Sequence, residues 1–231
     1  MRDTPRSFAL VPCAGVGARA GTDGPKQYAT LAGQAVVAHT LDALLAVPAL
    51  AATLVVLAPD DTQFESHAPR FHGPRAWLAR CGGATRAASV AAGLLALRER
   101  GASDDDWVLV HDAARCLLQP AWVQRLIDAC QDDAVGGLLA LPLADTLKVA
   151  ALGRVDCTLE RDCKWLAQTP QMFRLGLLQR ALLQAGEGVT DESSAIEALG
   201  LRPLLVAGEF ENLKLTWPAD FALAARLLET R

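Results

Sequence analysis

Short apolar runs that do not alternate with polar residues constrain the fold of this 231-residue chain more than any other feature. A strand with one solvent-exposed face alternates polar and apolar side chains, whereas a strand covered on both faces is apolar throughout. Segments with helical spacing separate these runs. Strands that alternate with helices predict an α/β fold: a Rossmann-like domain with a mostly parallel sheet flanked by helices. The predicted strands are residues 7–12, 53–57, 76–81, 107–110, 134–141 and 203–206.

Helical patterns fill most of the intervals between the strands. The predicted helices are residues 35–45, 85–98, 120–130, 174–184, 192–199 and 218–228. Residues 142–165 differ, because they are polar and carry β-like pieces on either side of Gly153. We expect a hairpin there that leaves the main sheet as an arm. Because the chain contains no repeat and no linker, we expect a single domain over residues 1–231, without a second catalytic domain.

The charge balance limits the possible partners. The chain has 22 Lys and Arg against 26 Asp and Glu, a formal net charge of −4, and 52% of its residues are hydrophobic. This composition is globular, and its mild acidity argues against nucleic acid or a membrane surface as a partner. No apolar run reaches the ~18 residues that a membrane helix needs. A polyanion can therefore bind only at a local basic site.

The cysteine pattern points to a compartment. The six cysteines form no C-x-x-C pair, and no histidine lies at zinc-binding spacing from them. Scattered cysteines in an apolar chain are typical of a reducing compartment, so we expect a cytoplasmic protein. One alternative is a signal peptide, because Arg2 and Arg6 precede the apolar residues 8–18. A proline and two glycines interrupt that stretch, which favours a buried strand that runs into a glycine-rich loop.

The loop after the first strand has several possible readings. Residues 15–20 match G-x-G-x-x-A, the dinucleotide-binding fingerprint. That fingerprint needs a helix to start inside the loop, but residues 21–25 contain two glycines and a proline, which would stop one. What remains is a loop whose backbone amides can approach a phosphate chain, with Arg19 and Lys26 as cations. A surface loop with solvated basic residues stays open as the alternative.

The ends of the predicted strands indicate where a ligand would bind. In parallel α/β sheets, ligands gather at the carboxyl ends of the strands. Residues 13–19, 82–83 and 111–115 each follow a predicted strand directly, so we expect them to form one site. The aspartates at 104–106 precede their strand, at the opposite edge of the sheet. We therefore expect a solvated turn there and no metal site.

Several short motifs, in register over residues 7–228, together resemble one group of nucleotidyltransferases. The motifs are Pro12-Cys13-Ala14-Gly15-x-Gly17-x-Arg19, Gly24-Pro25-Lys26-Gln27-Tyr28, Gly82-Gly83-x-x-Arg86-x-x-Ser89-Val90, Val110-His111-Asp112-Ala113-Ala114-Arg115, Pro142-x-x-Asp145-Thr146-x-Lys148, Thr169-Pro170-Gln171, Thr190-Asp191-Glu192-Ser193 and Asn212-x-Lys214. The order is similar to that in the 2-C-methyl-D-erythritol 4-phosphate cytidylyltransferases of the non-mevalonate isoprenoid pathway.

The resemblance implies a reaction and a cofactor. The chain would transfer CMP from CTP to 2-C-methyl-D-erythritol 4-phosphate, with Mg²⁺ or another divalent cation. The substrate phosphate would attack the α-phosphorus directly, giving 4-diphosphocytidyl-2-C-methyl-D-erythritol and pyrophosphate. One alternative is a cytidylyltransferase for another polyol phosphate, such as ribitol 5-phosphate. An alternative of another class is a catalytically silent nucleotide-binding or scaffold protein.

The resemblance also implies roles for individual residues. The catalytic cations at the triphosphate would be Arg19, Lys26 and Lys214, and the metal ligand Asp112. The nucleotide would contact Cys13, Ala14, Gly15, Gly17, Arg19, Lys26, Gly82, Gly83, Ser89, Asp112, Ala113 and Lys214. The polyol phosphate would contact Asp112, Arg115, Thr146, Arg161 and Thr190. The arm at 142–165 holds two of these and would be exchanged across a homodimer, completing the partner's site.

Some of these residues also have plain structural readings. Asp112 could cap the turn after its strand, and Arg161 could be a surface arginine between two acidic neighbours. We expect His111 to orient its neighbours and assign no chemistry to it. Two residues depart from the family pattern. Ala84 occupies a position where the family commonly has an aspartate that helps to recognise the cytosine amino group, so base choice would depend on backbone groups and Ser89. Cys13 replaces a common alanine and would place a thiol at the nucleotide.

Overall fold

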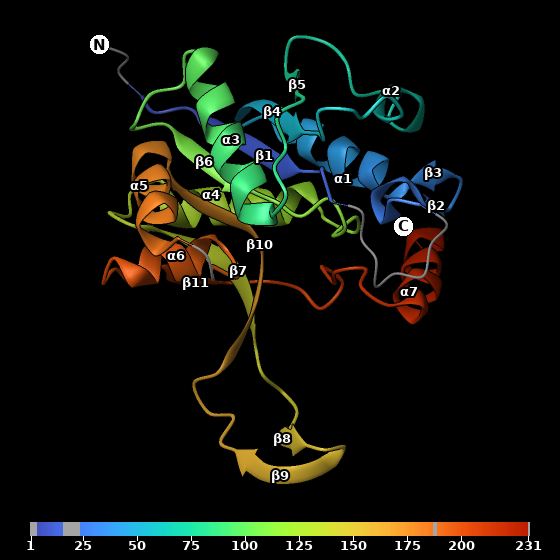
Figure 1. Ribbon diagram of the computed structural model, residues 1–231, viewed down its shortest axis with the longest axis vertical. Helices are drawn as coiled ribbons and strands as arrows, with labels where there is room; N and C mark the ends of the chain where they lie inside the picture. The colour runs from blue at the N-terminus through green and yellow to red at the C-terminus, as the bar shows by residue number, and fades with distance from the viewer. Residues whose placement is uncertain (1–3, 16–23, 187–188, 231) are drawn as a thin grey trace.

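The computed structural model describes residues 4–15, 24–186 and 189–230, which form an α/β domain around one central sheet (Figure 1). Two residues with predicted roles, Gly17 and Arg19, lie outside the described residues. The seven strands of the sheet follow the order β11-β7-β10-β6-β1-β4-β5. They are β1 (Ser7–Pro12), β4 (Leu50–Val56), β5 (Ala76–Ala79), β6 (Trp107–Val110), β7 (Gly136–Pro142), β10 (Trp165–Arg174) and β11 (Leu204–Ala207).

Helices cover both faces of this sheet. The helices of the described residues are α1 (Val36–Leu45), α2 (Phe64–His67), α3 (Arg86–Glu99), α4 (Pro120–Cys130), α5 (Leu175–Ala185), α6 (Glu192–Ala198) and α7 (Pro218–Glu229), with a short 3-10 helix, η2 (Lys26–Tyr28). Two small hairpins complete the fold, β2 (Thr30–Leu31) with β3 (Gln34–Ala35), and β8 (Leu147–Ala151) with β9 (Arg154–Leu159). Within the described ranges, no helix is long and apolar enough to cross a membrane.

The two faces of β1 explain why its sequence is apolar without alternation. Phe8 and Leu10 pack into the layer formed with α3, α5 and α6. Ala9 and Val11 pack into the opposite layer, formed with α1 and α4. All four side chains are almost completely buried, so neither face of the strand needs polar residues. The predicted sheet with helices on both faces is confirmed.

Strand β10 is the part of the sheet that the hydrophobic pattern of the sequence does not predict. It lies between β6 and β7 and runs antiparallel to both, while the other strands of the sheet run parallel to one another. Its middle contains Pro170 and the buried polar residues Gln168, Thr169 and Gln171. Neither proline nor buried amides are typical of a central strand, and the register with β7 is broken between Ala167 and Gln171.

The arm has the predicted form. Strands β8 and β9 pair antiparallel around Gly153, whose φ of +76° suits the turn between them. The hairpin projects from the lower edge of the body in Figure 1, and its residues are largely exposed. Thr146 and Arg161, both predicted to contact substrate, are exposed there.

The expectation of a solvated turn at 104–106 is wrong for Asp106. Its side chain is 1% exposed, and it accepts hydrogen bonds from the Arg6 backbone, the Arg6 guanidinium and the Ser103 backbone, each at 2.8 Å. Burial opposes ionisation, but these hydrogen bonds and the Arg6 charge lower the pKa of Asp106. The carboxylate therefore ties the N-terminal segment to the start of β6.

Candidate active site

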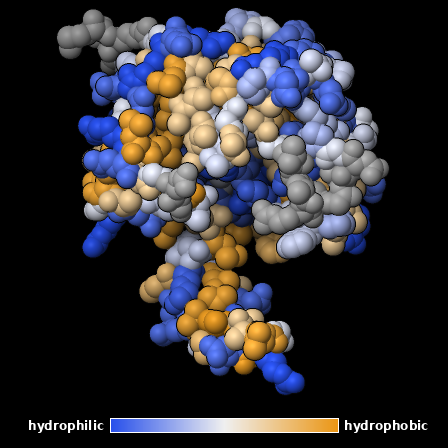
Figure 2. All heavy atoms as spheres, in the orientation of Figure 1, coloured by the Kyte–Doolittle hydropathy of each residue, from blue (hydrophilic) through white to orange (hydrophobic). Residues whose placement is uncertain are grey.

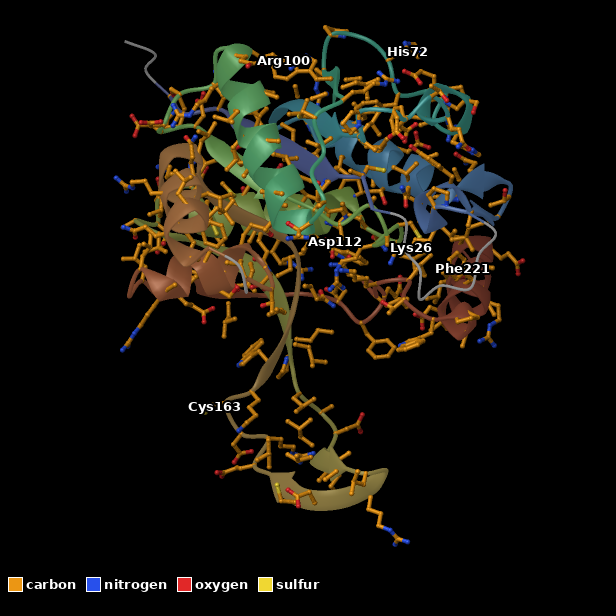
Figure 3. The ribbon with its side chains drawn as sticks, in the orientation of Figure 1. Lys26, His72, Arg100, Asp112, Cys163 and Phe221 are labelled. Atoms are coloured by element: carbon orange, nitrogen blue, oxygen red, sulfur yellow. The ribbon has the colours of Figure 1, made fainter. Side chains whose placement is uncertain are left out.

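Two adjoining cavities open at the carboxyl ends of β1 and β6, where the sequence predicts the site. The first, of about 300 Å³, is lined by Pro12, Cys13, Ala14, Gly15, Lys26, Gln27, Gly83, Ala84, Thr85, Arg86, Ser89, Asp112, Ala113, Ala114 and Lys214. The second, of about 210 Å³, is lined by Arg86, Asp112, Arg115, Ala167, Gln168, Thr169, Gln171, Thr190, Asp191 and Lys214. Arg86, Asp112 and Lys214 border both. Figure 2 shows a hydrophilic hollow in the body above the arm, and Figure 3 shows Asp112 and Lys26 in this region.

The first cavity collects nearly all of the predicted nucleotide residues that the structure describes. The exception is Gly82, which packs behind the lining. A Cβ at Gly82 would lie 2.3 Å from the Ala14 Cβ and 2.8 Å from the Leu57 carbonyl oxygen. Glycine is thus required there, because the segment after β5 packs closely against the ends of β1 and β4.

Two polar side chains shape the backbone of the first cavity. Gln27 donates from Nε2 to the carbonyl oxygens of Cys13, at 3.2 Å, and Gly15, at 2.9 Å. The Ser89 hydroxyl accepts from Gly83 N at 3.1 Å and donates to the Thr85 carbonyl oxygen at 3.0 Å. Ser89 is 3% exposed, so its hydroxyl is engaged in holding the start of α3. Gln27 has no role among those predicted from the sequence, although it belongs to the motif Gly24-Pro25-Lys26-Gln27-Tyr28.

The lysines of the first cavity come from segments far apart in the chain. Lys26 Nζ donates to the Leu215 carbonyl oxygen at 2.9 Å, and Leu215 N donates to the Ala114 carbonyl oxygen at 2.9 Å. Leu215 is fully buried in an apolar cluster with α7. These contacts fix the neighbouring residue, Lys214, whose Nζ lies 2.8 Å from Asp112 Oδ2.

Asp112 is the electrostatic centre of the two cavities. Its Oδ1 accepts from Arg86 Nε at 2.8 Å, and its Oδ2 faces Lys214. Burial by itself would raise the pKa of Asp112, but the charges of Arg86 and Lys214 outweigh burial and hold the pKa well below its usual range. The carboxylate is therefore ionised at neutral pH.

The second cavity contains the predicted substrate residues Asp112, Arg115 and Thr190. Arg115 donates from Nη1 to the Asn212 carbonyl oxygen at 2.6 Å, so it also holds the segment that carries Lys214. Its Nε lies 3.8 Å from Asp112 Oδ2 and has no hydrogen-bond partner in the part of the chain that the structure describes. The other two predicted residues, Thr146 and Arg161, lie on the arm and line neither cavity.

His111 has the structural role that is expected from the sequence. Its ring is fully buried, with Nε2 3.2 Å from the Arg115 carbonyl oxygen and Nδ1 3.1 Å from Thr169 Oγ1. Burial lowers the pKa of His111 to about 4. The neutral ring braces the turn after β6 against β10.

The donor set at Asp112 suits a magnesium ion that arrives with a triphosphate. The described residues contain no cluster of three or more His, Cys, Asp or Glu side chains that could hold a metal alone. Asp112 is the carboxylate that borders both cavities. Mg²⁺ is usually held by one or two carboxylates together with substrate phosphates. One ionised aspartate at the border of two cavities fits that pattern.

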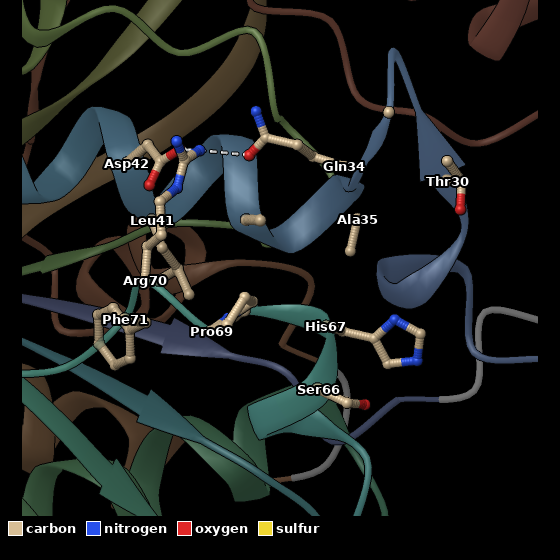
Figure 4. Close-up of a pocket in the computed structure, with 13 residues that line it drawn as sticks. Thr30, Gln34, Ala35, Leu41, Asp42, Ser66, His67, Pro69, Arg70 and Phe71 are labelled. Carbon is tan, nitrogen blue, oxygen red and sulfur yellow. Dashed lines mark hydrogen bonds and ion pairs between the residues drawn. The ribbon is translucent and has the colours of Figure 1, made fainter.

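A cavity larger than these two lies elsewhere in the described residues. It has a volume of about 490 Å³ and is formed mainly by α1, the β2–β3 hairpin and the segment after α2 (Figure 4). Within it, Arg70 pairs with Asp42 and also contacts the uncharged Gln34. It shares no lining residue with the two cavities above. Size alone therefore does not locate the chemistry here.

Comparisons with known proteins agree on one family. The family model described as IspD, 2-C-methyl-D-erythritol 4-phosphate cytidylyltransferase, matches residues 7–230. A 2-C-methyl-D-erythritol 4-phosphate cytidylyltransferase of Burkholderia vietnamiensis is 54% identical over 230 residues, with 97% of each chain covered. A bifunctional enzyme IspD/IspF of Albidiferax ferrireducens is 61% identical over 228 residues; this chain spans 54% of its length. A crystal structure of 4-diphosphocytidyl-2C-methyl-D-erythritol synthase superposes with a TM-score of 0.86 at 42% identity, covering 97% of this chain and 99% of that one.

Proposed function

Since the chain belongs to the 2-C-methyl-D-erythritol 4-phosphate cytidylyltransferase family, we propose how its residues divide the work of the family's reaction. The reaction is CTP-dependent cytidylyl transfer to 2-C-methyl-D-erythritol 4-phosphate in isoprenoid synthesis. The same comparisons do not favour the alternative of another polyol phosphate. The observation that carries the division of roles is that the two cavities share Arg86, Asp112 and Lys214.

The two substrates would meet at this shared border. CTP would occupy the first cavity and the polyol phosphate the second. An oxygen of the substrate phosphate forms a bond to the α-phosphorus of CTP, and the bond from that phosphorus to the bridging oxygen of the β-phosphate breaks. Pyrophosphate leaves with that electron pair. A phosphate monoester is already ionised near neutral pH, so the step needs no general base.

Fixed cations would supply most of the catalysis. Two anions must approach each other, and negative charge grows on the oxygens around the α-phosphorus. Lys26 and Lys214 line the first cavity from opposite ends of the chain. Lys26, Lys214 and Arg19 are the proposed catalytic cations, and Arg115 and Thr190 the proposed contacts to the substrate in the second cavity.

Asp112 would hold Mg²⁺ or another divalent cation at the phosphates. A bound ion would supply Lewis-acid neutralisation of the phosphate oxygens. The protein's own contribution is to keep the Asp112 carboxylate ionised and fixed between Arg86 and Lys214.

A homodimer would bring the arm to a site. The tip of the arm exposes Leu152 completely and Val155 by 64%, although both are apolar. Figure 2 shows apolar residues gathered on the arm. Exposed apolar surface of this kind is typical of an interface. We propose that the arm crosses to a second copy, where Thr146 and Arg161 complete the partner's second cavity.

A cytoplasmic location is the remaining proposal. Cys157 and Cys163 are free thiols, exposed on the arm. Exposed free thiols persist in a reducing compartment.

One assay tests the assigned function. Pyrophosphate release is measured with CTP and Mg²⁺, with methylerythritol phosphate and ribitol phosphate offered in turn. We expect release with methylerythritol phosphate; release with ribitol phosphate alone would exclude the assigned substrate, and release with neither would exclude an active enzyme.

A second experiment tests arm exchange. Inactive Arg161→Ala is mixed with inactive Lys26→Ala under conditions where subunits exchange. Mixed dimers should regain part of the activity, because one of their sites combines an intact arm with an intact first cavity. Mixed dimers that form and stay inactive would argue against the exchange.

A further inference from the structure

Arg86 joins two carboxylates at the border between the cavities. It is the first residue of α3, and its Nε donates to Asp112 Oδ1 at 2.8 Å. Its Nη1 and Nη2 donate to the two carboxylate oxygens of Glu192 at 2.6 and 3.0 Å. The guanidinium therefore uses both its Nε edge and its terminal fork, which a lysine could not do.

Glu192 is held rigidly in its place. It is the first residue of α6, 1% exposed, and Asp191 caps that helix. Gln171 of β10 fastens the helix start: its Oε1 accepts from Ser193 N and its Nε2 donates to Asp191 Oδ2, both at 2.8 Å. Glu192 is thus a fixed anchor that sets the position of the Arg86 guanidinium.

Asp112 lies at the other end of this chain of contacts. Its backbone N donates to Thr169 Oγ1 of β10 at 3.1 Å. Arg86 fixes one carboxylate oxygen, and Lys214 faces the other at 2.8 Å. Arg86 therefore fixes the orientation of the Asp112 carboxylate toward the two cavities. Lys214, the partner of the other oxygen, lies on a separate segment of the chain.

The charges show that Arg86 differs from the other cations around Asp112. Glu192 pairs with Arg86 through both oxygens and has no other ion-pair partner among the described residues. The charge of Arg86 is thereby largely compensated before any ligand enters. Lys214, at 38% side-chain exposure, is the more accessible cation. Arg86 is arranged to hold a carboxylate rather than to bind a phosphate.

We propose that Arg86, anchored by Glu192, is a positioning residue that sets the orientation of the Asp112 carboxylate between the two substrates. This inference rests on the proposed role of Asp112. It predicts that loss of Arg86 slows the transfer step more than it weakens the binding of either substrate.

The test separates positioning from simple compensation of a buried charge. Arg86→Gln, Arg86→Lys, Glu192→Gln and the double variant Arg86→Gln/Glu192→Gln are compared by steady-state pyrophosphate release and by thermal unfolding. Arg98→Gln is the matched control, because it removes an arginine of the same helix that pairs with Asp104 and Gln179 away from both cavities. Asp112→Asn is measured in parallel.

We expect Arg86→Gln to lower kcat at least ~30-fold with KM for each substrate within ~3-fold, because the lost contact matters most in the transition state. Its Tm should also fall, since Glu192 is left buried and unpaired. The double variant removes that buried charge, so its Tm should recover while kcat stays low. Arg86→Lys should regain part of kcat, and Glu192→Gln, which keeps the bond from Arg86 to Asp112, should lose less than ~5-fold.

Several results would overturn the inference. A double variant whose kcat recovers together with its Tm would show that Arg86 only compensates Glu192. A loss that appears in KM alone would make Arg86 a binding residue. A double variant that does not fold would show that the fold itself requires the arginine. If Asp112→Asn is fully active, the proposed site is wrong; if it is inactive while Arg86→Gln is active, only this inference fails.

Discussion

Lys214→Ala removes a proposed catalytic cation, whose expected contributions to catalysis and to stability differ in size. The Lys214 side chain is 38% exposed, and its Nζ lies 2.8 Å from Asp112 Oδ2. A partly exposed ion pair contributes at most ~1 kcal/mol to folding. A preorganised charge at the reacting phosphate is worth about 3–4 kcal/mol in the transition state, which is roughly 100- to 1,000-fold in rate. We therefore expect kcat/KM to fall at least ~100-fold while Tm changes by only a few degrees.

The assay is pyrophosphate release with CTP and methylerythritol phosphate, with thermal unfolding of the same preparations. Arg125→Ala is the matched control, because Arg125 is 40% exposed and its Nη1 lies 3.0 Å from Glu209 Oε1, outside both cavities. The control should lose as little stability as Lys214→Ala and keep its activity. Activity of Lys214→Ala within ~10-fold of the parent would refute the proposed role, because a preorganised charge at a reacting phosphate is worth roughly 100-fold or more in rate.

Three further predictions address packing, ionisation and base choice. Gly82→Ala should lower the free energy of unfolding by ~1–3 kcal/mol and weaken CTP binding, because the new Cβ would meet Ala14 at 2.3 Å; unchanged urea unfolding would contradict it. His111, with a pKa of about 4 when folded and 6.5 when unfolded, stabilises the protein fully above pH 6.5. The free energy of unfolding should fall as the pH drops from 6.5 to 4. Over that range the difference in free energy of unfolding between the parent and His111→Gln should shrink by about 3 kcal/mol, and a constant difference would contradict the prediction. Ala84→Asp should raise the CTP/UTP preference, because Ala84 lines the first cavity; an equal kcat/KM ratio would show that the position does not read the base.

Periodicity predicts most of this fold because most strands are buried on both faces. Residues 7–12, 107–110 and 120–130 have the predicted bounds, and the other predicted elements shift by one to three residues. Strand β10 fails this rule for a physical reason. Its middle is made of polar groups that bond to neighbouring segments, so hydropathy carries no signal there. The strand is visible only when the partners of Thr169 and Gln171 are known.

The candidate site, like the fold, is predicted from the sequence only in part. The motifs predict which residues meet, because the ends of parallel strands converge on one edge. They do not predict which of these side chains hydrogen-bond or form ion pairs with one another. Arg115 was expected to bind substrate, and it also donates to the Asn212 carbonyl oxygen. Arg86 belongs to a motif, but the sequence predicts no role for it. Its partner Glu192 is 106 residues away in the chain, so residue spacing cannot show that the two side chains meet.

The net charge of −4 gives no sign of the basic site, because the fold assembles its cations from separate parts of the chain. Arg86, Arg115 and Lys214 surround Asp112, although they come from three separate parts of the chain. With Glu192, the cluster has three cations against two carboxylates, so one positive charge is uncompensated in the free protein. That imbalance exists only after β10 has brought the end of β6 and the start of α6 together. An acidic chain can therefore form a polyanion site without a basic stretch of sequence. To do so it buries the polar side chains of β10 in the centre of the sheet.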